Sequence, residues 1–259
     1  MFFKKHKNII LPIAVFPILI LLWDLSIQIF DVPSYLLPRP GVLFESFIKL
    51  FQSGNIWEHI SITLQEIFIG TGIGIVVGVV LGYIMAKIRI FEKLMMPFII
   101  IIQTAPKISL APLFILWMGL GMESKVALVV MVVSFPIMIN QVLAIRSIDG
   151  NVYNLMKILN ASKLQKFIYV ELPYSIEMML SGIKVAVTQA MIGAVIGEMI
   201  GSKAGLGYLL VLGSETYDIN MILNSVLMLS FIGLVLYLIS EFMEKKILFW
   251  KEIEKSAIG

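Results

Sequence analysis

Four polar residues lie within stretches of the sequence that are otherwise apolar, and their types could do chemistry there. They are Gln103, Lys107, Lys184 and Gln189. A charge at the centre of a lipid bilayer costs about 2.5–3.5 kcal/mol on insertion scales, so each buried lysine needs a reason. One hypothesis is that these residues line a polar pathway, in which the two lysines favour an anionic solute.

Each lysine also has a structural explanation. Lys107 lies between Pro106 and a run that ends at Pro112, where it could neutralise carbonyls freed by a proline kink. Lys184 follows Glu177 by seven residues, which places both on one helical face, where they could form an ion pair. The residues alone leave the pathway and the structural interpretations open.

Other kinds of chemistry lack the residues they need. The chain has no cysteine, and its two histidines, His6 and His59, lack metal-ligand spacing. No Ser-His arrangement and no HExxH motif occurs, and the net charge of +3 is too small to suggest nucleic acid. We therefore expect no catalytic residue, no metal site and no cofactor bound by this chain.

The elements that position the polar residues follow from composition. Hydrophobic residues make up 59% of the chain and charged residues 14%, against about 25% charged residues in soluble domains. A bilayer core of about 30 Å needs roughly 20 apolar residues per helix. The sequence therefore predicts an all-α integral membrane protein with six transmembrane helices, at Ile9–Phe30, Ile62–Ala86, Leu94–Leu120, Val126–Ile145, Ile176–Ile200 and Met221–Phe242.

Two of these segments need comment. The first follows a basic start, as a secretory signal would, but it is longer than a signal and no small-x-small cleavage site follows it. We expect a retained helix. The third contains Pro97, Pro106 and Pro112, which predict a kinked helix.

Basic residues set the expected orientation, because cytoplasmic loops are enriched in lysine and arginine. With the N-terminus inside, the inner positions hold Lys4, Lys5, Lys7, Lys87, Arg89, Lys93, Arg146, Lys157, Lys163, Lys166, Lys245, Lys246, Lys251 and Lys255. The outer loops hold only Arg39, Lys49, Lys125 and Lys203. Both termini and the segment between the fourth and fifth spans are therefore predicted to be cytoplasmic.

The second predicted span carries a stripe of small residues. Its glycines recur every four residues, at Gly70, Gly74, Gly78 and Gly82. Such a stripe lets two helix backbones approach closely, where van der Waals packing drives association in lipid. The stripe fits helix packing within one subunit, and it also fits a seam between two subunits.

The cytoplasmic insert "NLMKILNASKLQKFIYVELP", residues 154–173, is basic and amphipathic. Val152, Leu155, Met156 and Leu159 have the i, i+3, i+4, i+7 spacing of one helical face. Asn160 suits the left-handed end of a helix, and Ser162 with Gln165 forms a capping-box signature.

We expect two short helices joined by a tight turn, the second closed by Leu172-Pro173. Neither would be stable alone in water, so their apolar faces must pack on the bundle, on a partner protein or on lipid headgroups.

The insert resembles the "EAA" loop of transmembrane permease subunits of binding-protein-dependent ABC importers. That loop runs Glu-Ala-Ala, three residues, Gly, nine residues, Ile-x-Leu-Pro. In this chain Asn154, Leu155 and Met156 take the Glu-Ala-Ala positions, Asn160 the Gly, and residues 170–173 the last element. Spacing is kept, but the first three residues and the Gly are replaced, so a salt bridge from the family's Glu is not expected.

Four further segments extend the resemblance to the nitrate/sulfonate/taurine branch of these permeases. They are "YLLPRPGVLFESF" from Tyr35, "QTAPKISLAPLFILWMGLGMESK" from Gln103, "SFPIMINQVLAIRSID" from Ser134 and "GEMIGSKAGLGYLL" from Gly197. The resemblance implies a type I importer transmembrane domain at 55–245, preceded by a segment at 1–54 with a cytoplasmic stub, the first helix and an external stretch. A cytoplasmic tail at 246–259 follows.

In that family the insert is a coupling loop, here residues 150–173, that docks on a separate ATPase. The docking residues implied are Asn154, Leu155, Met156, Leu159, Asn160, Ala161, Ser162, Leu172 and Pro173. No G-x-x-x-x-G-K-[ST] motif occurs in the chain, so ATP and Mg would bind the partner. The partners implied are two ATPase copies, an extracytoplasmic solute-binding protein and a second permease copy, in a bacterial inner membrane.

Two other function classes are weaker. An ion-coupled secondary transporter with six spans would also carry buried charges, but it has no use for a docking loop, and inverted repeats are not apparent. A membrane-embedded enzyme would need a catalytic cluster that the sequence does not offer. The solute stays open among nitrate, sulfonates, taurine, bicarbonate and vitamin precursors.

Overall fold

The computed structural model describes residues 2–248 of the chain, with side chains described for residues 15–248. Every regular element in this part is a helix, as predicted. The side chains of Lys4, Lys5 and Lys7 and most of the predicted tail 246–259 lie outside the described residues. The elements are α1 Phe2–Ile29, α2 Pro40–Gln52, α3 Ile56–Lys87, α4 Arg89–Thr104, α5 Lys107–Met118, α6 Met122–Arg146, α7 Gly150–Ile158, α8 Lys163–Lys166, the π-helix η1 Phe167–Glu171, α9 Leu172–Gly201, α10 Leu206–Glu215 and α11 Ile219–Ile247.

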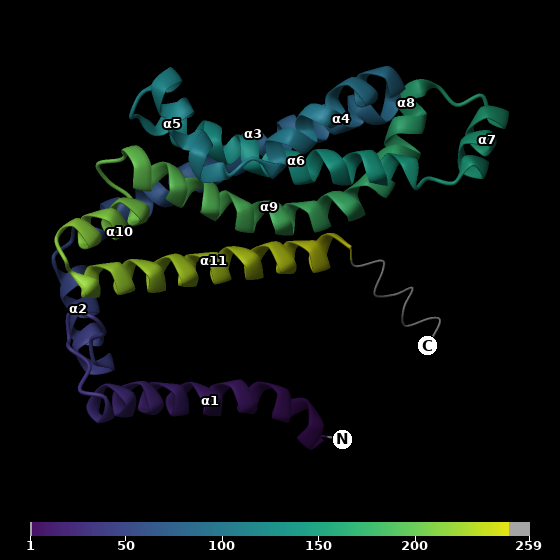
Figure 1. The fold of residues 1–259 in the computed structure, drawn as a ribbon. Helices are drawn as coiled ribbons and strands as arrows, with labels where there is room; N and C mark the ends of the chain where they lie inside the picture. The colour runs from purple at the N-terminus through teal and green to yellow at the C-terminus, as the bar shows by residue number, and fades with distance from the viewer. Residues whose placement is uncertain (1, 249–259) are drawn as a thin grey trace.

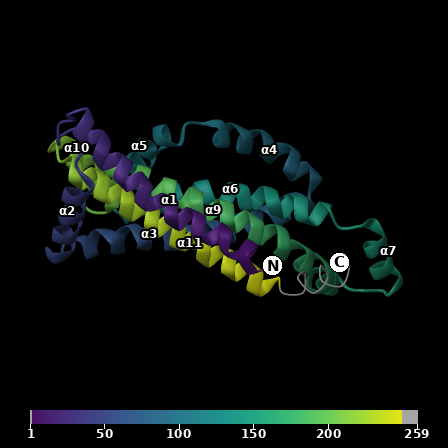
Figure 2. The ribbon, with the colours of Figure 1, turned by 90° about the horizontal axis from the view of Figure 1, so that it is seen from below.

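The long helices run side by side in a layered bundle (Figure 1). Helix α6 packs between α3 and α9, and α11 packs against α9 on the outside. Helices α2 and α10 lie at one end of the molecule and α7 lies at the other, in both views (Figures 1 and 2). We call these the α10 end and the α7 end. Helix α1 lies apart from the packed helices and contacts α2.

The glycine stripe of α3 explains its close approach to α6. A Cβ added at Gly70 or Gly74 would lie 2.5–2.6 Å from the side chains of Val129 or Val133. At Gly78 it would lie 2.7 Å from the carbonyl oxygen of Ser134, which is backbone and cannot move aside. The stripe therefore packs on a helix of the same chain.

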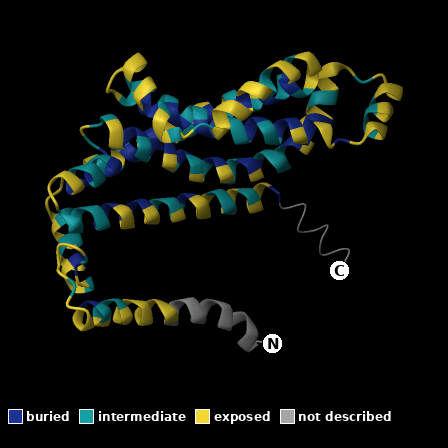
Figure 3. Ribbon diagram, in the orientation of Figure 1, coloured by how far each residue is buried: buried dark blue, intermediate teal, exposed yellow. Residues whose placement is uncertain are grey.

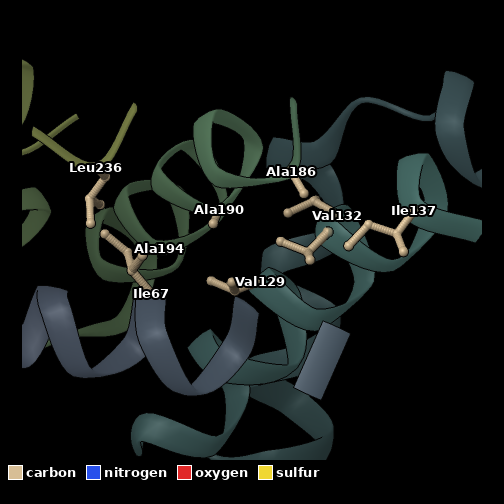
Figure 4. Packing of buried hydrophobic residues seen from close by; sticks show 9 residues of the cluster. Ile67, Val129, Val132, Ile137, Ala186, Ala190, Ala194 and Leu236 are labelled. Atoms are coloured by element: carbon tan, nitrogen blue, oxygen red, sulfur yellow. The ribbon is translucent and has the colours of Figure 1, made fainter. Parts of the chain in front are cut away.

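Helix α9 covers the other side of α6 with small residues that the sequence analysis did not single out. Ala186, Ala190 and Ala194 are fully buried, together with Val129 and Val133 of α6. Figure 4 shows the alanines close to the valines of α6. Figure 3 shows that burial is concentrated where α3, α6 and α9 meet, while the outward faces of the helices are exposed, as expected of surfaces that face lipid.

Four of the described helices are long and apolar enough to cross a membrane: α3, α6, the continuous helix Lys163–Gly201, and α11. The pair α4 and α5 adds a fifth crossing if the two form one broken span. The first predicted span corresponds to α1, a helix of 28 residues whose side chains are described only from Val15 on, and Val15–Ile29 is apolar. Six spans thus stay a prediction.

The predicted third span, Leu94–Leu120, is broken rather than kinked. Helices α4 and α5 meet at an angle of 104°. Pro97 and Pro112 lie inside the two helices, whereas Ala105 and Pro106 both adopt extended backbone, with ψ of 138° and 112°. The residue before a proline is pushed out of the helical region, so the break falls at Ala105-Pro106.

The coupling loop is two helices joined at Asn160, as predicted. Asn160 is left-handed with φ of 50°, and Ser162 and Gln165 form both bonds of the capping box. The predicted end at Leu172-Pro173 is wrong, because α8 continues through η1 into α9. Pro173 has no N–H to donate, and the wider π turn, in which the Leu172 N–H donates to the Phe167 carbonyl, accommodates it.

Candidate functional site

The coupling loop presents an apolar surface at the α7 end. Leu155, Ile158, Leu159 and Leu164 are 55–76% exposed. The residues predicted to share one face of α7 lie on two sides of it. Val152 and Met156 pack inward on a cluster formed by Ile145, Ile148 and Val170, whereas the leucines point away from the bundle. One side of α7 therefore attaches it to the bundle, and the neighbouring side is left uncovered in the single chain.

The other residues implied for docking mostly share the exposed side. Exposed in the structure are Asn154, Asn160, Ser162, Leu172 and Pro173, while Ala161 is half-buried. Met156 is the member that the structure places against its own bundle. Ile158 and Leu164 are exposed on the same surface and were not among the residues implied for docking.

A polar network joins α7 to the bundle. The Glu171 carboxylate, 3% exposed, accepts hydrogen bonds from the Tyr83 hydroxyl at 2.8 Å and from the Tyr153 hydroxyl at 3.3 Å. Lys87 forms an ion pair with the same carboxylate. We call Tyr83, Lys87, Tyr153 and Glu171 the α7-end network. The sequence did not predict this network, because its four residues come from three separate elements, α3, α7 and η1.

Three of the four predicted pathway residues meet at one cavity of about 190 Å³. The break between α4 and α5 places Gln103 and Lys107 on its wall, and Gln189 reaches it from α9. The Lys107 ammonium donates to Oε1 of Gln189, which leaves the Gln189 amide N–H groups available. Apolar residues complete the lining: Ile102, Met131, Val132, Phe135, Pro136 and Val185.

Lys184, the fourth predicted pathway residue, lies outside this cavity. It forms an ion pair with Glu244 of α11, toward the α7 end of the bundle. The cavity therefore contains one ammonium group and two amides. Because the rest of its lining is apolar, these three polar groups would set the orientation of a bound solute. Gln103 is exposed, so the cavity opens at the surface of the single chain.

A second buried polar group lies at the α10 end, and the sequence analysis assigned it no role. Glu198 of α9, 1% exposed, accepts from the Thr63 hydroxyl at 2.5 Å and from the Gly207 N–H at 2.5 Å. Glu66, also buried, lies beside Glu198. A Cβ at Gly207 would meet the carbonyl oxygen of Val195 at 2.7 Å, so only glycine fits there.

Lys125 was expected in an outer loop and instead lies in α6, 2% exposed. Its ammonium donates to the carbonyls of Leu120, Gly121 and Gly201. Gly201 ends α9, where a cation complements the negative end of the helix dipole. We call Thr63, Glu66, Lys125 and Glu198 the α10-end cluster.

Comparison with known families and proteins supports the resemblance. The profile of the family described as binding-protein-dependent transport system inner membrane component matches residues 74–248. The chain is 32% identical over 241 residues to the riboflavin transport system permease protein RibX of Chloroflexus aurantiacus, covering 93% of this chain and 90% of the relative.

Two further relatives and one structure extend this comparison. The formylaminopyrimidine transport permease protein ThiX of Halalkalibacterium halodurans is 31% identical, with 96% of this chain and 99% of the relative covered. The putative aliphatic sulfonates transport permease protein SsuC of Bacillus subtilis is 26% identical over 95% of this chain and 87% of the relative. An inward-facing structure of the MetNI methionine ABC transporter matches 76% of this chain and 95% of its own with a TM-score of 0.60 and 17% identity, which supports the fold.

Proposed function

Because the chain belongs to the family of binding-protein-dependent transport system inner membrane components, we propose that it is the permease subunit of an ATP-driven importer. In this proposal it has six spans with both termini in the cytoplasm. The type I domain occupies 55–245, the first helix and external segment 1–54, and a cytoplasmic tail 246–259. The start of α1 and the end of α11 both lie toward the α7 end, which supports this topology (Figure 1).

The observation that carries the proposal is the uncovered apolar side of the coupling loop. Leu155, Ile158 and, just past the helix end, Leu159 are exposed on a nine-residue helix that is too short to be stable alone. The basic residues around them favour the cytoplasm rather than lipid as their surroundings. A groove on a separate ATPase subunit would bury these leucines, and one ATPase would dock on each of two permease copies.

We propose that the cavity between α4, α5, α6 and α9 is the half of the translocation pathway that this chain contributes. Its lining residues Ile102 and Gln103 are exposed, so the cavity is open on one side, where a second copy of the chain would cover it. Gln103, Lys107 and Gln189 would then face a solute that an external binding protein delivers.

The solute we propose is small and either anionic or a vitamin precursor. Lys107 favours an anion, and the amides of Gln103 and Gln189 can both donate to and accept from a polar heterocycle. The named relatives include permeases for riboflavin, formylaminopyrimidine and sulfonates.

Lys107 provides the test of this pathway. We expect Lys107→Ala to lower import of an anionic solute at least about tenfold, whereas Lys184→Ala, which loses an ion pair outside the cavity, retains it. Import that is unchanged in Lys107→Ala would contradict the proposed pathway.

Docking is tested by co-purification in detergent with a candidate ABC ATPase subunit from the same organism. We expect stable binding by the natural chain and its loss, by at least about 30-fold in affinity, in Leu155→Glu/Leu159→Glu. Leu36→Glu, which charges an exposed leucine at the opposite end, is the control and should bind normally. Solute movement down an ion gradient by the chain alone in liposomes, without ATP, would replace the importer by an ion-coupled transporter.

A further inference from the structure

The α7-end network gathers three elements around one carboxylate. Tyr83 and Lys87 are in the last turns of α3, Tyr153 is in α7, and Glu171 ends the π-helix that leads into α9. The described contacts of the Glu171 carboxylate are the two tyrosine hydroxyls and the Lys87 ammonium. A buried carboxylate with charge-assisted partners is held in a defined geometry, since each partner must point at it.

Lys87 is fixed from more than one direction. Its ammonium lies 5.5 Å from the ring centroid of Tyr83 and 5.5 Å from that of Tyr153. Cation–π attraction therefore adds to the ion pair with Glu171. The Tyr83 ring also packs edge-on against Phe167 of the π-helix, with centroids 5.4 Å apart.

The backbone of Glu171 extends the connection to α6. Its carbonyl accepts a hydrogen bond from the Ser175 hydroxyl at 2.6 Å, and the same hydroxyl accepts from Nε2 of Gln141 at 3.2 Å. All the atoms of this second link are buried. Glu171 is thus the residue at which α3, α6, α7 and α9 are joined by directional bonds.

The π turn is what brings Glu171 to this position. An α-helix running unbroken into Pro173 would leave the Tyr169 carbonyl without its usual donor. The wider turn at Phe167–Glu171 resolves that conflict and rotates the residues that follow. The Leu-Pro element therefore places a carboxylate between the coupling loop and the bundle.

Helix α7 is otherwise attached by apolar contacts of Val152 and Met156. Apolar contacts have no preferred direction, so they let a short helix slide or rotate without a large change in energy. We propose that Glu171 is the positioning residue that makes α3 and α9 follow α7 when a bound ATPase moves it. This inference rests on the proposed function.

Tyr153 keeps its hydroxyl proton in this arrangement. Burial first, and then the negative charge and hydrogen bond of Glu171, raise the pKa of Tyr153 from 10.0 to about 12. The stabilisation by the neutral hydroxyl is therefore fully present below pH 10 and is lost as pH rises through about 12. The link from α7 to Glu171 is intact throughout the physiological range.

The test uses the absence of cysteine from the sequence, which allows single spin labels. Lys157→Cys reports the distance between the two α7 helices of the dimer, and Val80→Cys reports the distance between the two α3 helices. Both positions are exposed, and neither contributes to the network. Distances are measured by pulsed electron resonance on the complex with the ATPase, before and after addition of Mg-ATP and vanadate.

We expect both distances to shift in the natural background. In Glu171→Gln the Lys157→Cys distance should still shift, whereas the Val80→Cys distance should lose most of its shift. Tyr153→Phe removes the hydrogen bond from α7 to Glu171 and leaves the Lys87 ion pair. It should therefore also reduce the shift of the Val80→Cys distance, while preserving the fold. Lys87→Glu/Glu171→Lys, which restores the pair with reversed charges, should recover part of the shift at α3.

Glu92→Gln is the matched control. Glu92 pairs with Arg146 near the α7 end and joins α4 to the end of α6. Both distances should shift normally in this variant. A full shift at Val80→Cys in both Glu171→Gln and Tyr153→Phe would overturn the inference. Failure of the ATPase to bind the natural chain, or of Mg-ATP to move the α7 label, would instead contradict the proposed function.

Discussion

The two ends of the bundle hold buried charges in different ways. At the α10 end, Lys125 and Glu198 are 2% and 1% exposed, and most of their partners are backbone carbonyls and N–H groups. At the α7 end, the partners of Glu171 are side chains of separate elements, and Lys87 is 36% exposed. Backbone partners fix a charge at one helix end, whereas side-chain partners from separate elements tie those elements to one another. The α10 end is therefore held rigid by its backbone contacts, and at the α7 end we propose that the bonds of Glu171 make neighbouring helices move together.

The largest effect that this comparison predicts is on stability at the α10 end. Lys125→Met removes the donor of three carbonyls and leaves buried carboxyl groups without a nearby cation. We expect a loss of about 3–5 kcal/mol in the free energy of unfolding. The measurement is unfolding from detergent micelles by titration with sodium dodecyl sulfate. Lys203→Met, an exposed lysine at the same end, is the control, and equal stability of the two variants would remove the distinction between the ends.

The matching change at the α7 end should cost less. Glu171→Gln keeps an acceptor oxygen for the tyrosine hydroxyls and loses the charge opposite the half-exposed Lys87. We expect a loss of about 1.5–3 kcal/mol in the free energy of unfolding, measured by the same titration, because a hydrogen bond to a charged group contributes about that much. A loss larger than that of Lys125→Met would reverse the proposed order of the two ends.

The helix packing between the ends can be tested with one substitution at two positions of α3. Gly78→Ala places a methyl group against backbone of α6, so we expect a loss of about 1–3 kcal/mol in the free energy of unfolding. At Gly72 nothing lies within 4 Å of the added Cβ, so Gly72→Ala should leave stability unchanged or raise it by up to about 1 kcal/mol. Equal effects would mean that the stripe does not pack on α6.

The smallest expected effect is on the cap of α8. Ser162→Ala removes one half of the capping box and should cost about 1 kcal/mol of local stability. Hydrogen exchange of the amides of residues 163–166 is the measurement, and faster exchange there is the expected result. Ser61→Ala, at a serine inside α3 whose hydroxyl donates to the Glu58 carbonyl, should leave those amides unchanged.

Much of this organisation follows from local pattern. The long apolar segments predict α3, α6, α9 and α11, and Asn160 with the capping box predicts the turn of the coupling loop, because these signals depend on neighbours in sequence. Helices α2 and α10 were not predicted as separate elements, since both are shorter than a membrane span and lack its length signal. The sequence could not show which of the three prolines of the third span breaks the helix. In the structure Pro97 and Pro112 lie inside helices, and the break falls at Pro106.

The contacts of the buried charged residues could not be predicted from the sequence, for a different reason. Glu66, Lys125 and Glu198 come together from α3, α6 and α9, and Glu171 meets partners from α3 and α7. One sequence gives no distance between helices, so it cannot pair such groups. Lys107 and Gln189 were both predicted pathway residues, and the structure brings them into contact, while the pathway itself stays a prediction. Lys184 was predicted as a pathway residue on the same ground, its polarity within an apolar segment, but in the structure it forms an ion pair with Glu244 outside the cavity.

Hydrogen exchange with and without the ATPase tests the central claim most directly, because it compares the two ends in one experiment. If the α7 end is the docking end, the amides of residues 154–166 become protected when a candidate ABC ATPase subunit from the same organism is added, while those of residues 203–220 at the α10 end keep their rates. Protection that is absent at 154–166, or equal at both ends, would contradict this account.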